Sequence, residues 1–113
     1  KLLNKETIFA ERVNGKFKLR RGFNIKKKSR VLIIEDVITT GKSSLECVKL
    51  INKSKGKLLG FASIIDRSNN KSLKIKGKKI ISQIKINVPS FTKKNLPKSL
   101  RQIPITKPGS RYI

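Results

Sequence analysis

The fold of this chain is decided by residues 30–43, which read RVLIIEDVITTGKS. An uninterrupted apolar run at 31–34 predicts a strand that is buried on both faces. Glu35 and Asp36 follow it, and burying two carboxylates without partners is costly. We therefore expect both side chains at an open strand end, with a bound partner. The turn TTGKS at 39–43 then opens a helix, whose first N–H groups favour an anion.

Length and composition predict one domain, or part of one, from 113 residues. The sequence begins at Lys1 rather than Met, and a strand-like run starts almost at once, so we expect the N-terminal part of a larger domain to be missing. No stretch resembles a signal peptide or a membrane span, so no membrane partner is expected. The single cysteine, Cys47, excludes an internal disulfide framework and predicts a cytoplasmic location.

The net charge of +23 invites a nucleic-acid interpretation. The basic residues are mostly lysines, spread over loops and ends among many Ile and Asn, as compositional drift across a whole proteome would also produce. We favour drift over a dedicated polyanion surface, because charge says little about fold. The five phenylalanines lie far apart in the sequence, so a base-stacking platform is not indicated and a nucleic-acid partner is not expected.

Periodicity and turn residues divide the chain into short elements. Strands at 7–10 and 16–20 flank an Asn-Gly turn and predict a hairpin. Apolar residues at helical spacing predict a helix over 44–53 that Gly56 ends, and an apolar strand at 58–65 follows. A right-handed crossover makes that strand parallel to 31–34. A more exposed strand is expected at 79–88, and an irregular tail with one short helical turn after it.

These elements predict an α/β fold, an open and mostly parallel sheet flanked by helices. Residues 1–88 form part of its core, and residues 89–113 form a tail that packs on the same domain. Ligands of such sheets bind outside the carboxyl ends of the strands. Two strands end there in charged pairs, Glu35-Asp36 and Asp66-Arg67. Carboxylates suit the vicinal hydroxyls of a ribose or a divalent cation held through water, and the 39–43 turn suits a phosphate.

A solvated strand–helix loop with a helix cap is the alternative for any one acidic pair. The whole 30–43 stretch, however, resembles the phosphoribosyl pyrophosphate (PRPP) motif of type I phosphoribosyltransferases: apolar residues, two acidic residues, then Thr-Thr-Gly and a hydroxyl residue. A Walker loop is excluded, because Asp36 stands where its first glycine belongs. Further stretches resemble the orotate-specific members of that family: FAER at 9–12, LRRGF at 19–23, IDR at 65–67 and KPGSR at 107–111.

This resemblance implies transfer of the phosphoribosyl group from PRPP to orotate, with Mg2+ as cofactor, in a homodimer with shared active sites. It implies that Thr39 and Arg67 contact the orotate. Arg67 also suits that role physically, because its guanidinium matches a carboxylate bidentately; pairing with Asp66 at the surface is the alternative. For PRPP, the carboxylates would take the ribose hydroxyls and the following turn the 5′-phosphate, within the run Glu35, Asp36, Val37, Ile38, Thr39, Thr40, Gly41, Lys42 and Ser43.

Positive charge near the departing pyrophosphate stabilises the transition state. In the family a mobile loop supplies it, and the hairpin region 11–21 stands in that place, which makes Arg12, Lys16 and Lys18 the catalytic candidates. The resemblance also implies a substrate hood and a pyrophosphate loop upstream of Lys1, so we expect no turnover from the chain as it stands. The rivals are another activity on the same fold, such as purine salvage or an RNA-binding regulator, and a small basic nucleic-acid-binding protein.

Overall fold

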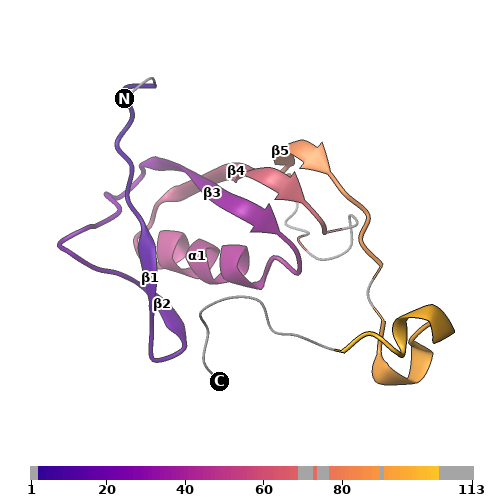
Figure 1. Ribbon diagram of the computed structural model, residues 1–113. Coiled ribbons are helices and arrows are strands. Elements are labelled where there is room, and N and C mark those ends of the chain that lie inside the picture. The colour runs from indigo at the N-terminus through magenta and orange to yellow at the C-terminus, as the bar shows by residue number, and fades with distance from the viewer. Residues whose placement is uncertain (1–2, 69–72, 74–76, 90, 105–113) are drawn as a thin grey trace.

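The computed structural model describes residues 3–68, 73, 77–89 and 91–104 (Figure 1). An antiparallel hairpin pairs β1 (Ala10–Val13) with β2 (Lys16–Leu19). A parallel sheet follows in the order β3 (Arg30–Ile38), β4 (Lys57–Asp66) and β5 (Ile80–Lys85). Helix α1 (Lys42–Lys53) connects β3 to β4, and two 3-10 turns, η1 (Lys93–Asn95) and η2 (Lys98–Leu100), form the tail. The expected α/β class and parallel sheet are confirmed.

The β3–α1–β4 unit carries the core. Ile33 on β3 lies beside Phe61 on β4, and Phe61 lies beside Ile80 on β5. Helix α1 packs over this face of the sheet and contributes Ile51, which is 2% exposed. The buried cluster consists of Ile33, Ile38, Ile51, Leu58, Phe61 and Leu73. Burial of this one face gives the unit most of its hydrophobic stabilisation.

The opposite face of the sheet is exposed, and the expectation that residues 31–34 are buried on both faces is wrong for the described part of the chain. Ile34 is 70% exposed and Ile81 is 70% exposed, and Ala62 lies between them in register. Ile64 on the same face is 55% exposed. The sequence run looks doubly buried because both faces of β3 are apolar, yet α1 covers only one of them (Figure 1).

A residue in the left-handed backbone conformation stands at each end of helix α1. Gly41, at its N-cap, has φ 68°, and no side chain caps this end. At the other end the N–H of Ser54 donates to the carbonyl of Leu50 (3.1 Å), and Lys55 has φ 56°. Gly56 takes part in ending the helix as expected, because its N–H donates to the Ile51 carbonyl (3.0 Å), but Lys55 rather than Gly56 adopts the left-handed conformation. A Cβ at Gly56 would stand 3.0 Å from the Ile25 side chain.

The hairpin forms at the expected Asn-Gly turn, where Asn14 has φ 49° and Gly15 has φ 75°. Its first strand is Ala10–Val13 rather than the expected 7–10, because pairing with β2 runs outward from the turn. Strand β5 is shorter than the expected 79–88, and the tail holds two 3-10 turns rather than one. Packing of the 89–113 tail on the domain stays a prediction, and the KPGSR stretch at 107–111 lies outside the described residues.

Among the described helices, none has the length and apolar character that a bilayer crossing demands.

Candidate active site

The carboxyl ends of β3 and β4 lie side by side, as the parallel topology requires. Ile38 and Asp66 are register partners, and the N–H of Arg67 donates to the carbonyl of Ile38 at 2.7 Å. This bond crosses between the two strand ends from which the expected site residues come. The structure thus brings the 35–43 stretch and Arg67 to one edge of the sheet.

The two adjacent carboxylates point to opposite faces. Strand β3 continues through them to Ile38, so alternation separates their side chains. Glu35 is half-buried on the α1 side, where its carboxylate accepts a hydrogen bond from the hydroxyl of Ser44. Asp36 is exposed, and its carboxylate accepts from the N–H of Val37 at 2.7 Å. They are therefore two different groups, one tied inward and one open to a ligand.

The 39–43 turn presents backbone donors. Gly41 is buried with φ 68°, which a non-glycine residue adopts only with strain. The first helical hydrogen bond runs from the N–H of Leu45 to the carbonyl of Gly41 at 2.9 Å. The N–H of Lys42 reaches the Thr40 hydroxyl at 3.4 Å, and no side chain caps the helix. A helix start of this kind favours an anion through its first-turn N–H groups and its dipole.

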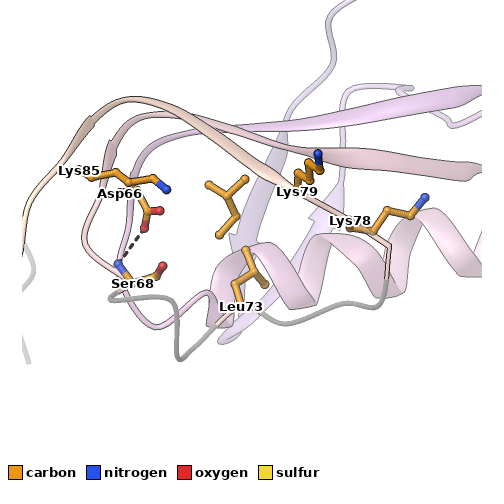
Figure 2. A pocket seen from close by; sticks show the side chains of 7 residues that line it. Asp66, Ser68, Leu73, Lys78, Lys79 and Lys85 are labelled. Carbon is orange, nitrogen blue, oxygen red and sulfur yellow. Dashed lines mark hydrogen bonds between the residues drawn. The ribbon is translucent and has the colours of Figure 1, made fainter.

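Arg67 is exposed next to this turn, whereas Asp66 is only 5% exposed. The Asp66 carboxylate accepts from the N–H of Ser68 at 2.8 Å and lines a cavity of about 250 Å³ with Ser68, Leu73, Lys78, Lys79, Ile80 and Lys85 (Figure 2). Within the described ranges no ion pair joins Asp66 to Arg67. The alternative that Arg67 serves as a surface partner for Asp66 therefore gains no support.

The three catalytic candidates belong to the β1–β2 hairpin, and the contacts of Arg12 are with α1 and with the hairpin itself. The Arg12 guanidinium forms an ion pair with Glu46 of α1 at 3.2 Å, donates to the Gly15 carbonyl and stacks 4.4 Å from the Phe17 ring centre. Lys16 and Lys18 are exposed on β2. The hairpin is thus docked through Arg12 on the chain's own helix.

Glu46 is the anchor of that docking. Its other carboxylate oxygen accepts from the N–H of Phe17 at 3.3 Å. Partial burial works to raise the pKa of Glu46, but hydrogen bonds from Arg12 and Phe17 and the charges of Arg12 and Lys42 outweigh it, and the pKa lies below its ordinary value of 4.5. A carboxylate held in its charged form by donors is the expected partner for an arginine.

Cys47, the next residue on α1, is half-buried. Burial raises the pKa of its thiol above the ordinary 9.0, and the nearby carboxylates of Glu35 and Glu46 raise it further. The protonated thiol is a weak nucleophile.

Sequence reasoning missed Ser44, Glu46 and Leu73. Ser44 is completely buried and binds Glu35, Glu46 binds the hairpin, and Leu73 packs against Gly41, where a Cβ would lie 2.8 Å from the Leu73 Cβ. Only Glu46 had a usable signal, as the one acidic residue of α1. The other two act through contacts that bring together residues distant in the sequence.

An uncapped helix start after a glycine turn, beside an open carboxylate at the carboxyl edge of a parallel sheet, defines an α/β protein with a candidate anion site at its strand ends. The chain belongs to the phosphoribosyltransferase family, because residues 4–94 match the phosphoribosyl transferase domain.

The chain is 45% identical over 106 residues to the orotate phosphoribosyltransferase of Parvibaculum lavamentivorans, covering 94% of this chain and 54% of that protein. It is 43% identical over 107 residues to the orotate phosphoribosyltransferase of a Thermoanaerobacter species, covering 94% of this chain and 55% of the relative. The chain therefore spans about half the length of the curated relatives it matches.

A solved adenine phosphoribosyltransferase from Rhodothermus marinus superposes with a TM-score of 0.53 at 21% identity, over 73% of this chain and 50% of that one. At this identity the likeness supports the fold alone. It agrees with the type I phosphoribosyltransferase fold expected from the sequence.

Proposed function

We propose that this chain is part of an orotate phosphoribosyltransferase, which transfers the phosphoribosyl group from PRPP to orotate. The observation that carries the proposal is the 35–43 segment, an exposed carboxylate followed by a glycine turn and an uncapped helix start. The turn suits the 5′-phosphate, and Asp36 suits the ribose hydroxyls. The reaction would break the bond from C1′ to pyrophosphate, form a bond from C1′ to the orotate ring nitrogen, and release orotidine 5′-monophosphate and pyrophosphate.

The preference for orotate over a purine rests on sequence likeness and on Arg67. Both relatives described above are named orotate phosphoribosyltransferases, whereas the structural neighbour is named for adenine. Orotate carries a carboxylate that an adenine ring lacks. Arg67 is exposed beside the turn and offers the planar donor fork that a carboxylate prefers. Thr39, at the junction of β3 and the turn, would contact the orotate as well as PRPP.

Mg2+ fits this edge as a companion of PRPP rather than as a resident ion. Among the described residues, no three carboxylate, histidine or cysteine groups lie close enough together to hold a metal. Glu35 and Asp36 point to opposite faces, so they do not form a chelating pair. A diphosphate supplies its own oxygen ligands to Mg2+, and Asp36 would contact the ion through water.

The remaining parts of the activity are carried by the family likeness. Arg12, Lys16 and Lys18 would stabilise the departing pyrophosphate after the hairpin leaves α1, in the site of a second copy within a homodimer with shared active sites. A cytoplasmic location, where PRPP and orotate meet, completes the proposal.

Binding of labelled orotate, hypoxanthine and uracil in the presence of PRPP tests the assignment. We expect orotate to bind in preference, and Arg67→Ala to weaken it. Arg30→Ala is the matched control, because Arg30 is exposed at the opposite end of β3. Tight purine binding together with unchanged orotate affinity in Arg67→Ala would overturn the orotate assignment.

A second arm tests the PRPP site. Exchanging Glu35→Gln and Asp36→Asn together should weaken PRPP binding sharply, because the ribose hydroxyls lose their charged acceptors. Unchanged PRPP affinity in this double variant would remove the phosphoribosyltransferase proposal itself. The nucleic-acid alternative predicts instead RNA binding that falls steeply with salt and ignores both exchanges.

A further inference from the structure

Two adjacent arginines bind one carboxylate at the end of the β1–β2 hairpin that lies opposite its turn. A terminal guanidinium nitrogen of Arg20 lies 3.4 Å from Oε2 of Glu11, and one of Arg21 lies 3.1 Å from Oε1 of the same side chain. Each carboxylate oxygen therefore faces a different arginine. The two guanidinium groups converge on a single anionic group.

Strand register and a tight turn bring these three side chains together. Glu11 is the register partner of Lys18, so Arg20, two positions further on, lies diagonally across from Glu11. The chain then reverses in a turn that is closed by the N–H of Phe23, which donates to the Arg20 carbonyl at 3.0 Å. Arg21 has φ 56° within this turn, an uncommon conformation for a residue with a side chain, and its guanidinium returns to Glu11.

An aromatic ring packs against the second guanidinium. The Cζ atom of Arg21 lies 5.1 Å from the centre of the Phe9 ring, and this ring meets Phe23 edge-to-face with centres 5.0 Å apart. Arg21 is thus oriented both by Phe9 and by Glu11. A guanidinium that is already oriented loses less conformational entropy on binding an anion than a free one does.

The arginines remain open to solvent. Their side chains are 58% and 69% exposed, and ion pairs with this exposure are weak and screened by salt. Residues 9–23 hold five basic residues and a single acidic one, Glu11, so the surroundings attract a further anion. A phosphoryl group presents oxygens with a spacing similar to those of a carboxylate and carries more charge, so it displaces Glu11 at little cost.

We propose that Arg20 and Arg21 form a binding site for a diphosphate group, and that the Glu11 carboxylate occupies this site when the ligand is absent. A diphosphate has two phosphoryl groups, one for each guanidinium fork. The inference rests on the proposed function and deepens it, because PRPP carries a diphosphate and its transfer reaction releases pyrophosphate. It assigns the diphosphate to these two arginines and leaves the 5′-phosphate to the 39–43 turn.

Titration with inorganic pyrophosphate, PRPP and ribose 5-phosphate tests this site. Exchanging Arg20→Gln and Arg21→Gln together should weaken pyrophosphate and PRPP binding roughly tenfold, as expected for lost hydrogen bonds to a charged group. Ribose 5-phosphate lacks the diphosphate, so its affinity should stay unchanged. Lys26→Gln with Lys27→Gln is the matched control, because it removes the same two charges from adjacent exposed positions. Equal losses in both double variants, or none in either, would overturn the proposed site.

Glu11→Gln separates a ligand site from a purely structural role. As the occupant of the site, Glu11 competes with the ligand, so its exchange should strengthen pyrophosphate binding roughly two- to fivefold, the worth of an exposed ion pair. A Glu11 that only holds the hairpin together predicts the opposite, a loss of affinity as the hairpin loosens. Glu6→Gln removes the same charge from an exposed side chain that forms no ion pair with another described residue. A loss in Glu11→Gln, or a gain no larger than in Glu6→Gln, would contradict the inference.

Failure of the proposed function gives a different pattern. If neither PRPP nor ribose 5-phosphate binds, the proposed function fails, and inorganic pyrophosphate still decides about the arginine site. If ribose 5-phosphate binds and the two arginine exchanges leave pyrophosphate affinity intact, the proposed function stands and the arginine site is wrong. The Phe17 amide resonance reports in every variant whether the hairpin is still bound to Glu46.

Discussion

Gly41→Ala should destabilise the chain by two separable effects at the centre of the site. The first is backbone strain, because φ is +68° at this position. Placing an alanine in the left-handed region costs about 1–2 kcal/mol. The second is a collision, because the new Cβ would lie 2.8 Å from Cβ and 3.0 Å from Cδ1 of Leu73.

The collision is not relieved by a simple rotation of the leucine. The nearest atom is the Leu73 Cβ, which moves only with its backbone, and the Leu73 side chain is 7% exposed within the core. Overpacking of this kind costs about 1–3 kcal/mol. The total is about 2–5 kcal/mol, a large share of the roughly 5–15 kcal/mol that stabilises a domain.

Urea unfolding provides the assay, with Gly22→Ala as the matched control. Gly22 has φ +74°, and a Cβ there would meet no atom within 4 Å, so this variant measures the strain alone. The excess of Gly41→Ala over Gly22→Ala then reports the collision, about 1–3 kcal/mol. In a Leu73→Gly background the excess should shrink, because this exchange also removes the Cβ that lies closest to the new methyl group.

Equal destabilisation by Gly41→Ala and Gly22→Ala would refute the packing of Leu73 on the 39–43 turn. An excess that survives unchanged in the Leu73→Gly background would refute it as well. Ribose 5-phosphate affinity should fall in Gly41→Ala and stay unchanged in Gly22→Ala, since only the first alters the 39–43 turn.

Three further predictions concern the helix and the hairpin. The pKa of Glu46 is lowered in the folded chain, so the Glu46 carboxylate stabilises hairpin docking fully above pH 4.5 and this contribution is lost as the pH falls through the lower pKa of the folded chain. The Phe17 amide resonance should shift with pH in that range, and Glu46→Gln should abolish the shift. The raised pKa of Cys47 predicts slower alkylation by iodoacetamide at neutral pH than that of free glutathione, and a rate that still increases with pH beyond 9.0 instead of levelling off there. Ser63→Ala should leave the free energy of unfolding unchanged or raise it slightly, because it removes a buried hydroxyl without a partner. A loss of about 1 kcal/mol or more, the net worth of a typical hydrogen bond, would show that the Ser63 hydroxyl has a partner after all.

The β3–α1–β4 unit could be predicted from the sequence because its information is local. A run of apolar residues, a glycine turn and a helical stripe each specify their own element, and the short connections allow one handedness. The site edge follows from the same elements, since parallel strands end together. The hairpin turn was equally local, and only the first strand was displaced.

The predictions that proved wrong concern where β3 ends and which segments cover its faces. The sequence prediction ended the strand at residue 34, whereas β3 runs to Ile38, and this extension alone turns Glu35 and Asp36 to opposite faces. Exposure of Ile34 could not be foreseen, because an apolar side chain does not specify which segment packs on it. The contacts of Glu46 with Arg12 and of Leu73 with Gly41 link residues more than thirty positions apart, and no local pattern specifies such partners.

The hydrogen bond between the N–H of Arg67 and the carbonyl of Ile38 has a kinetic consequence. It closes only when β3 and β4 have paired across the intervening helix, a contact between distant parts of the chain that forms late compared with a hairpin. The 39–43 turn therefore reaches its final conformation only when β3 and β4 pair. A folding intermediate that holds only the β1–β2 hairpin and a nascent α1 would have no affinity for PRPP. During refolding, PRPP binding would recover at the same rate as the Arg67 amide gains protection from hydrogen exchange.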